Sequence, residues 1–167
     1  MNVGLVVGRK VINKKIYMSY DSRIDTLLHI KRVSELLNCF AKELIERGDV
    51  HDDSKLVSPE KELFDELTPL LSSLTYGSPE YQESLDRLKV ALDHHYANNS
   101  HHPQHYENGV NGMDLLDLVE MFFDWKAATE RTKDGDIRKS VEINSTRFNI
   151  SPQLVNIFNN TITNYNW

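Results

Sequence analysis

Cysteine is almost absent from this chain of 167 residues, which contains only Cys39. A single cysteine excludes an intrachain disulfide and a metal cluster held by several thiolates. Cys39 follows Leu36 and Leu37 and precedes Phe40 in an apolar helical pattern. We therefore expect a small core residue there rather than a nucleophile.

Long apolar runs are absent as well. No stretch approaches the roughly 20 apolar residues of a membrane-spanning helix, and the first residues lack the apolar segment of a signal peptide. We expect a protein of the reducing cytoplasm, the host cytoplasm if a phage encodes it, with no membrane partner.

Positive charge is in deficit, since the formal net charge is −6. This balance gives no general reason to expect nucleic-acid binding. Residues 1–20 differ from the rest because they carry basic side chains and no acidic one. We expect an N-terminal basic arm or hairpin over 1–20, followed by one helical domain over 21–167.

From residue 21 onward, apolar residues recur at steps of three and four, which is the spacing of one face of an α-helix. Serine, proline and glutamate stand together at 58–60 and again at 78–80, a pattern typical of a helix start with a capping hydroxyl. The predicted fold class is all-α, a single-domain helical bundle that allows a short N-terminal β-hairpin. The expected helices span about 21–48, 59–74, 79–96, 113–132 and 136–147, with a last helix after 152.

The seven histidines fall in three places, which are His29, His51 and a group of five within residues 94–105. Imidazole is the commonest metal ligand in proteins, and hard or borderline divalent metals take it together with carboxylates. His29 belongs to the core-facing stripe of the first predicted helix. In the third, His95 continues the apolar face and is favoured as the inward ligand, while His94 lies beside it and could serve if the helix end frays.

Carboxylates accompany the histidines at two points. His51 and Asp52 open the run "HDDSK", which is interpreted either as a charged helix start or as half of a metal site. In the fourth predicted helix, Asp117, Asp124 and Arg131 fall along one line. Charged groups on an otherwise apolar helix need partners if they are buried, and a solvated stripe is the alternative.

The order of these residues resembles the HD-domain superfamily of metal-dependent phosphohydrolases. The resemblance rests on His29, then the pair His51-Asp52, then Asp124, and on "HDDSK", which is similar to an HD-x-x-K variant. A closer resemblance covers most of residues 22–165. It is to an uncharacterised family of phages and bacteria that shares the blocks "HD-x-SK", "HHY…N-x-HHP-x-H" and "DWKAA".

The resemblance implies an HD-like helical bundle and roles for particular residues. It implies one or two divalent metal ions, with Mn, Fe, Zn, Ni, Co and Mg not distinguishable from the sequence. The expected ligands are His29, His51, Asp52, Asp124, either or both of His94 and His95, and His101 or His102. Asp52 and Lys55 are the expected catalytic residues, and the expected substrate contacts are Lys55, His101, His105 and Arg131.

The leading expectation is hydrolysis of a nucleotide or a related small phosphate ester, and a homo-oligomer is left open. Two alternatives remain. Some HD-fold proteins hold two irons with four histidines and two aspartates and activate dioxygen. A non-catalytic module, in which the metal staples the bundle or the pocket retains a nucleotide, is the other alternative.

Overall fold

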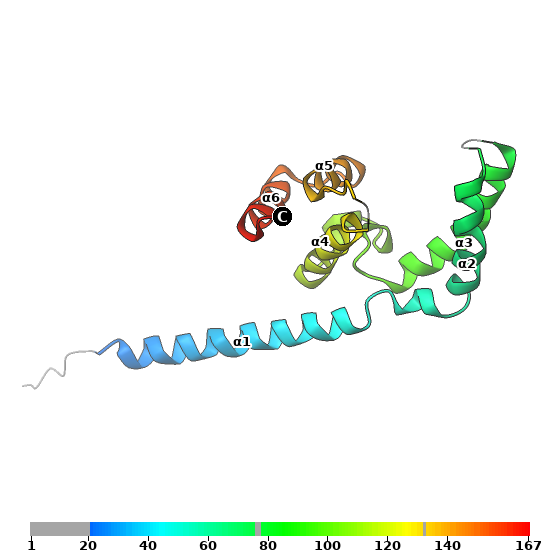
Figure 1. Cartoon of the computed structure of the whole chain (residues 1–167). Helices are drawn as coiled ribbons and strands as arrows, with labels where there is room; N and C mark the ends of the chain where they lie inside the picture. The colour runs from blue at the N-terminus through cyan, green and yellow to red at the C-terminus, as the bar shows by residue number, and fades with distance from the viewer. Residues whose placement is uncertain (1–20, 76–77, 132) are drawn as a thin grey trace, which may run out of the picture. The chain divides into compact units, whose positions relative to one another are not determined.

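The regular elements are helical throughout the residues that this computed structural model describes, which are 21–75, 78–131 and 133–167 (Figure 1). The all-α prediction is therefore confirmed for that part of the chain, and the predicted arm or hairpin over 1–20 lies outside it. Among the described residues, no helix combines the length and apolarity needed to cross a membrane. The elements are α1 (Arg23–Asp49), η1 (Asp53–Leu56), α2 (Glu60–Ser73), α3 (Pro79–Asn98), η2 (Pro103–His105), η3 (Gly109–Gly112), α4 (Leu115–Thr129), α5 (Ile137–Arg147) and α6 (Pro152–Tyr165), where η denotes a short 3-10 helix.

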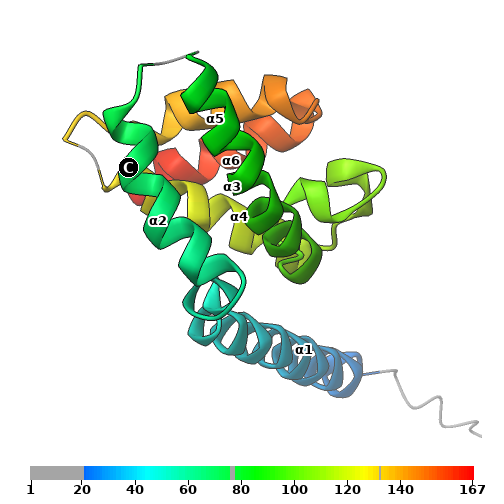
Figure 2. The same cartoon turned by 90° about the vertical axis from the view of Figure 1, so that its right-hand side faces the viewer.

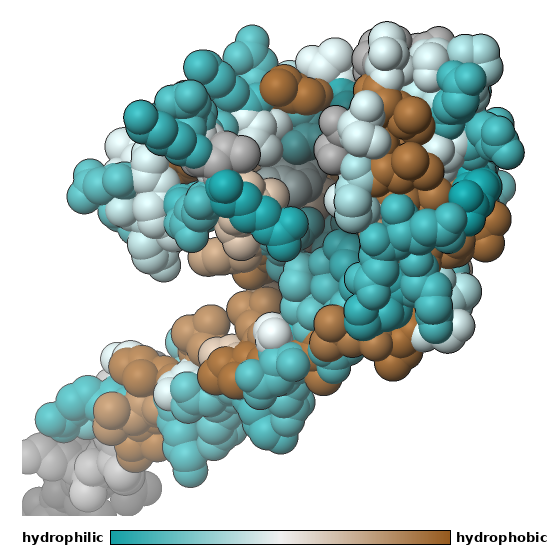
Figure 3. Space-filling model, turned by 45° about the vertical axis from the view of Figure 1, so that its right-hand side comes forward, coloured by the Kyte–Doolittle hydropathy of each residue, from teal (hydrophilic) through white to brown (hydrophobic). Residues whose placement is uncertain are grey.

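The chain divides into two units between Phe40 and Ala41, so that α1 contributes to both. The described part of the first unit is a lone helical segment, whose surface carries apolar side chains among polar ones (Figure 3). His29 and Cys39 are exposed on it, contrary to the prediction of core positions for both. Among the described residues of this unit, the helix has no second element against which to bury an apolar face.

The core of the second unit lies between α4, α5 and α6. The ring of Phe122 on α4 stacks on Phe158 of α6, with 4.9 Å between ring centroids. In Figures 1 and 2, α5 and α6 lie side by side. The buried core residues are Met121, Phe122, Trp125, Ile137, Val141, Ile150, Phe158 and Ile162.

α2 and α3 form an antiparallel pair (Figures 1 and 2). Leu67 of α2 and Ala91 of α3 have no exposed surface. Because the two helices run in opposite directions, the C-terminal end of α3 returns to η1 and to the start of α2. This pairing carries the histidines at the end of α3 back to the His51-Asp52 turn.

Side chains at the helix ends explain where most helices begin. Ser78 accepts a hydrogen bond from the backbone N–H of Tyr81, so the predicted cap by Ser78 is confirmed. Ser151 caps α6 in the same way, through a hydrogen bond from the backbone N–H of Leu154. The predicted cap by Ser58 is wrong, because α2 begins one residue later, after Pro59, without a side-chain cap.

Candidate metal centre

A tight turn after α1 presents His51 and Asp52 together. Asp52 has φ 59° and ψ 16°, the left-handed conformation that aspartate tolerates better than most residues with a side chain. His51 Nε2 lies 3.5 Å from Asp52 Oδ2. The Asp52 carboxylate then stands immediately before η1, close to the end of α3.

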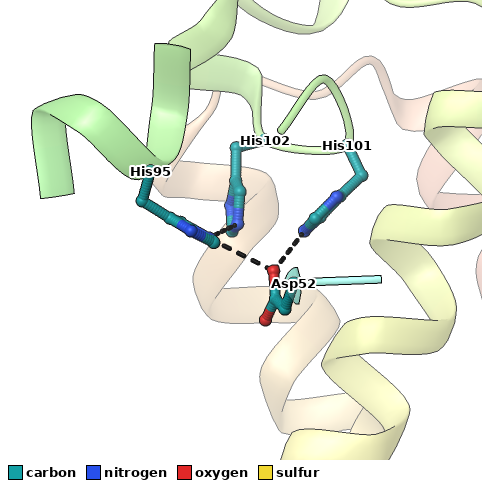
Figure 4. Close-up of side chains that lie close together, drawn as sticks. All are labelled: Asp52, His95, His101 and His102. Carbon is teal, nitrogen blue, oxygen red and sulfur yellow. Dashed lines mark hydrogen bonds and ion pairs between the residues drawn. The ribbon is translucent and has the colours of Figure 1, made fainter. Parts of the chain in front are cut away.

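Three histidine rings surround the Asp52 carboxylate (Figure 4). Asp52 Oδ1 lies 3.3 Å from His95 Nε2 and 3.4 Å from His101 Nε2. His95 Nε2 is also 2.8 Å from His102 Nε2. One potential ligand atom from each of these four residues lies within 4.8 Å of the others, which is close enough to share one ion.

A second group of potential ligands adjoins the first and shares His101 with it. It consists of His51, His101 and Asp124, again with ligand atoms within 4.8 Å of one another. His51 Nε2 lies 3.7 Å from Asp124 Oδ1. Together the two groups bring four histidines and two aspartates to one place.

Glu120 of α4 orients two of these histidines from outside the cluster. Its Oε1 is 2.8 Å from His51 Nδ1 and 3.0 Å from His101 Nδ1. Its Oε2 accepts a hydrogen bond of 2.6 Å from Arg47 Nε. With Nδ1–H donated to a carboxylate, each imidazole keeps its Nε2 lone pair for the centre, the usual arrangement around metal-binding histidines.

Glu60 plays the same role on the other side. This fully buried carboxylate lies 2.7 Å from His94 Nδ1 and 2.9 Å from His95 Nδ1, and it accepts a 3.0 Å hydrogen bond from Ser54 Oγ. Burial raises the pKa of Glu60, but these hydrogen bonds outweigh it and hold the pKa below its usual range. Glu60 is therefore an ionised acceptor that fixes the His95 ring with Nε2 inward.

Two atoms inside the cluster have no hydrogen-bond partner although they are buried. They are Asp52 Oδ1 and His101 Nε2. A buried polar atom left unpaired is costly, and native proteins rarely tolerate one without a reason. Both atoms are acceptors when His101 donates through Nδ1, and a cation between them would satisfy both. The donor set of imidazoles and carboxylates fits a divalent metal.

Burial and the neighbouring charges shift the pKa values of the cluster residues in both directions. The interaction with Asp124, followed by that with Glu120, raises the pKa of His51 to about 10. Burial, followed by the charges of neighbouring histidines, lowers the pKa of His102 to about 3. Burial raises the pKa of Asp52, but the hydrogen bonds from His101, His95 and Lys55 lower it by more, so the carboxylate stays ionised. Protons and a divalent cation compete for such a centre.

A family model described as a family of unknown function, DUF5662, matches residues 18–164. The chain belongs to this family. No curated protein and no solved structure matches it. The description of the DUF5662 family names no activity, so the chemistry of this member is argued from its own residues.

Most of the residues predicted for the site of this DUF5662 protein do come together. His51, Asp52, His95, His102 and Asp124 all belong to the two ligand groups. The preference for His95 over His94 is in line with these groups, and His94 instead contacts Glu60. His101, predicted to contact substrate, joins both ligand groups.

The other predicted residues lie outside these groups. Lys55 Nζ donates a 2.6 Å hydrogen bond to Asp52 Oδ2, at the edge of the centre. His105 Nδ1 is held 2.8 Å from the carbonyl oxygen of Tyr96, and Arg131 is exposed in the turn after α4. Their substrate contacts stay predictions. His29 belongs to the first unit, so its assignment as a ligand also stays a prediction.

Sequence reasoning assigned no role to the residues that hold the ligands in place. Glu60 looked like an ordinary acid in the first turn of a helix, and Glu120 stood beside the line of Asp117 and Asp124. Glu120 precedes Asp124 by four residues, which places both on one helix face and was the available signal. Arg47 gave no signal at all.

Proposed function

We propose that this protein is a metal-dependent phosphohydrolase that acts on a small phosphate ester, with a nucleotide as the leading class. The observation that carries the proposal is the convergence of imidazole Nε2 atoms and carboxylates on the buried, unpaired atoms Asp52 Oδ1 and His101 Nε2. The resemblance to HD-domain phosphohydrolases supports the choice of reaction.

A divalent cation at such a centre supplies positive charge beside phosphoryl oxygens and lowers the pKa of water towards about 7. The residues that would hold it are those of the two ligand groups. Glu60 and Glu120 keep the histidine rings oriented through Nδ1. Asp52 presents Oδ1 to the centre and binds Lys55 through Oδ2.

Lys55 is the side chain best placed to contact a phosphoryl oxygen. Its ammonium group is held 2.6 Å from Asp52 and its side chain is 40% exposed, so a ligand can reach it. An ammonium group there neutralises charge that develops on a phosphoryl oxygen during transfer. Asp52 therefore has two roles. Its Oδ1 is a potential metal ligand, and its Oδ2 positions Lys55.

The charge of the site links substrate binding to the metal. The carboxylates Asp52 and Asp124 lie in the cluster, and Glu60 and Glu120 flank it. An anionic phosphate ester is repelled by these groups unless a cation compensates them. Binding of a phosphate ester is therefore expected to require prior metal binding.

The test is elemental analysis of the pure protein, followed by phosphate release from a nucleotide panel with Mn²⁺, Mg²⁺, Zn²⁺, Ni²⁺, Co²⁺ or Fe²⁺. Asp52→Asn is expected to lower both bound metal and turnover by at least about 100-fold, since it removes the charge of the only carboxylate in the first ligand group. Asp53→Asn is the matched control, because Asp53 is the neighbouring, exposed acid of the same run. Full turnover in a folded Asp52→Asn protein would refute the proposal.

A di-iron oxygenase is the second candidate, and one observation favours it. The two ligand groups share His101 and together comprise four histidines and two aspartates, the composition expected of the di-iron HD proteins. Two irons in the purified protein and an oxygen-dependent change in its absorption spectrum would decide for this candidate. A metal retained without turnover or oxygen chemistry would instead indicate a stapled, non-catalytic module.

A further inference from the structure

An apolar pocket opens beside the metal centre, between the last turns of α1 and the middle of α4. Its volume is about 460 Å³, which is within the range of small-molecule sites. The walls are formed by Leu44 and Ile45 of α1 and by Val119, Phe123 and Ala127 of α4. All of these residues belong to the second unit.

The polar lining of the pocket is confined to the side of the metal centre. His51 and Asp124 line the pocket and also form part of the second ligand group. Glu120, which orients His51, is the other charged residue of the lining. A molecule in the pocket would therefore touch apolar walls along most of its length and the ligand residues at one end.

The lining specifies the chemistry of an occupant. Among the residues that the structure describes, the lining contains no lysine, arginine, hydroxyl or amide side chain. A sugar placed against these walls would lose hydrogen bonds to water without replacement, which is costly. A ring-sized apolar group loses nothing and gains burial against Phe123, Leu44 and Ile45.

We propose that this pocket binds a ring-sized apolar group of the substrate, attached to an anionic end that lies at the metal centre. The assignment of that end as phosphoryl rests on the proposed function. The pocket thereby selects esters with an aryl or similar apolar substituent, or a nucleotide whose base face packs on Phe123, over phosphorylated sugars.

Phenylphosphonate and methylphosphonate test this inference, because they share an anionic head group and differ in the ring. Neither is an ester, so binding is measured without turnover. With the Mn²⁺-loaded full chain in a calorimetric titration, phenylphosphonate is expected to bind at least about tenfold more tightly, or about 1.4 kcal/mol. Equal affinity, or no binding of phenylphosphonate, would overturn the inference.

Pocket-filling variants locate the ring. Ala127→Phe is expected to abolish the preference for phenylphosphonate while leaving methylphosphonate affinity unchanged. Ala128→Phe is the matched control, since Ala128 is the adjacent exposed alanine of α4 and does not line the pocket. Gly48→Leu fills the pocket from the opposite wall, where an added Cβ meets no atom within 4 Å. A preference that survives both filling variants in folded protein would contradict the assignment.

The outcome is separable from that of the proposed function. A ring preference that Ala127→Phe removes, in a protein that hydrolyses no phosphate ester, would sustain the pocket and end the hydrolase proposal. Hydrolysis with no ring preference would do the reverse. Circular dichroism of each variant confirms that its helices are intact.

Discussion

His101 Nε2 and Asp52 Oδ1 face each other at 3.4 Å, both buried and both without a hydrogen-bond partner. The two residues come from segments separated by α2 and α3. Elsewhere in the described part of the centre, imidazole nitrogens such as His51 Nδ1 and His95 Nδ1 are paired with carboxylates. This contrast identifies the gap between the two atoms as the place where a cation would be held.

Metal binding is expected to raise the melting temperature. A ligand that binds only the folded chain, at about 100 times its Kd, stabilises it by about 2.7 kcal/mol. For a domain of this size, that corresponds to a rise of roughly 5–10 °C. Differential scanning fluorimetry with each metal measures the shift. His101→Ala, which removes the shared residue of both groups, should abolish it, whereas His105→Ala should not.

Glu120→Gln is expected to weaken metal affinity by about 10- to 100-fold without removing a ligand, because the amide is a poorer acceptor for His51 and His101. A chelator competition gives the affinity. Glu130→Gln, on an exposed residue just past the end of α4, serves as the control. Unchanged affinity in Glu120→Gln would mean that the carboxylate has no influence on the rings.

Asp117→Asn is expected to destabilise the fold. Asp117 is 2% exposed and accepts hydrogen bonds from Arg47, Ser100 and Tyr106. Removing one charge of a buried pair costs about 3–5 kcal/mol, and we expect about 2–3 kcal/mol because Arg47 is partly solvated. Urea unfolding measures the loss. Asp93→Asn, in an exposed pair with Lys89, should stay close to wild type.

The lowered pKa of Asp117 predicts that the metal-free protein loses stability in acid. Burial raises the pKa of Asp117, but hydrogen bonds from Ser100, Tyr106 and Arg47 outweigh it, so the folded-state pKa is lowered. The carboxylate therefore contributes its full stability above its unfolded pKa of about 3.9, and this contribution is lost as the pH falls through the lower folded value. Urea midpoints should fall less steeply in Asp117→Asn than in wild type below about pH 4. Parallel curves would count against this linkage.

Phe158→Ala should cost about 3–5 kcal/mol, because it removes a ring that stacks on Phe122 inside the core of α4, α5 and α6. Ile157→Ala is the neighbouring control, since Ile157 is 58% exposed. Thermal unfolding of the two variants side by side gives the difference. Similar losses of unfolding free energy in both variants would mean that Phe158 is not part of the core.

The helices could be predicted from the sequence because they depend on local periodicity, whereas most of the expected ligands were implied by the resemblance to HD-domain proteins. The spacing of apolar residues placed α3 within two residues of its observed end, and it favoured His95 as the inward histidine. The capping prediction failed at Ser58, where the helix begins after Pro59.

Tertiary placement set the limit of sequence reasoning. Glu60 holds His95 only because the antiparallel pair of α2 and α3 brings them together across 35 residues of chain. Arg47 reaches Glu120 across 73 residues. No short-range pattern encodes such contacts. The spacing of Glu120 to Asp124 places Glu120 on the helix face of a ligand, but it does not reveal that Glu120 binds Arg47 and the histidines.

The left-handed turn at Asp52 directs two neighbouring side chains to different ligand groups. His51 belongs to one group and Asp52 to the other. Backbone length at this corner is consequently as decisive as ligand identity. Inserting one glycine between these two residues would keep every donor atom in the protein and still misalign the pair. Anyone transplanting this centre onto a designed scaffold must copy the corner along with the side chains.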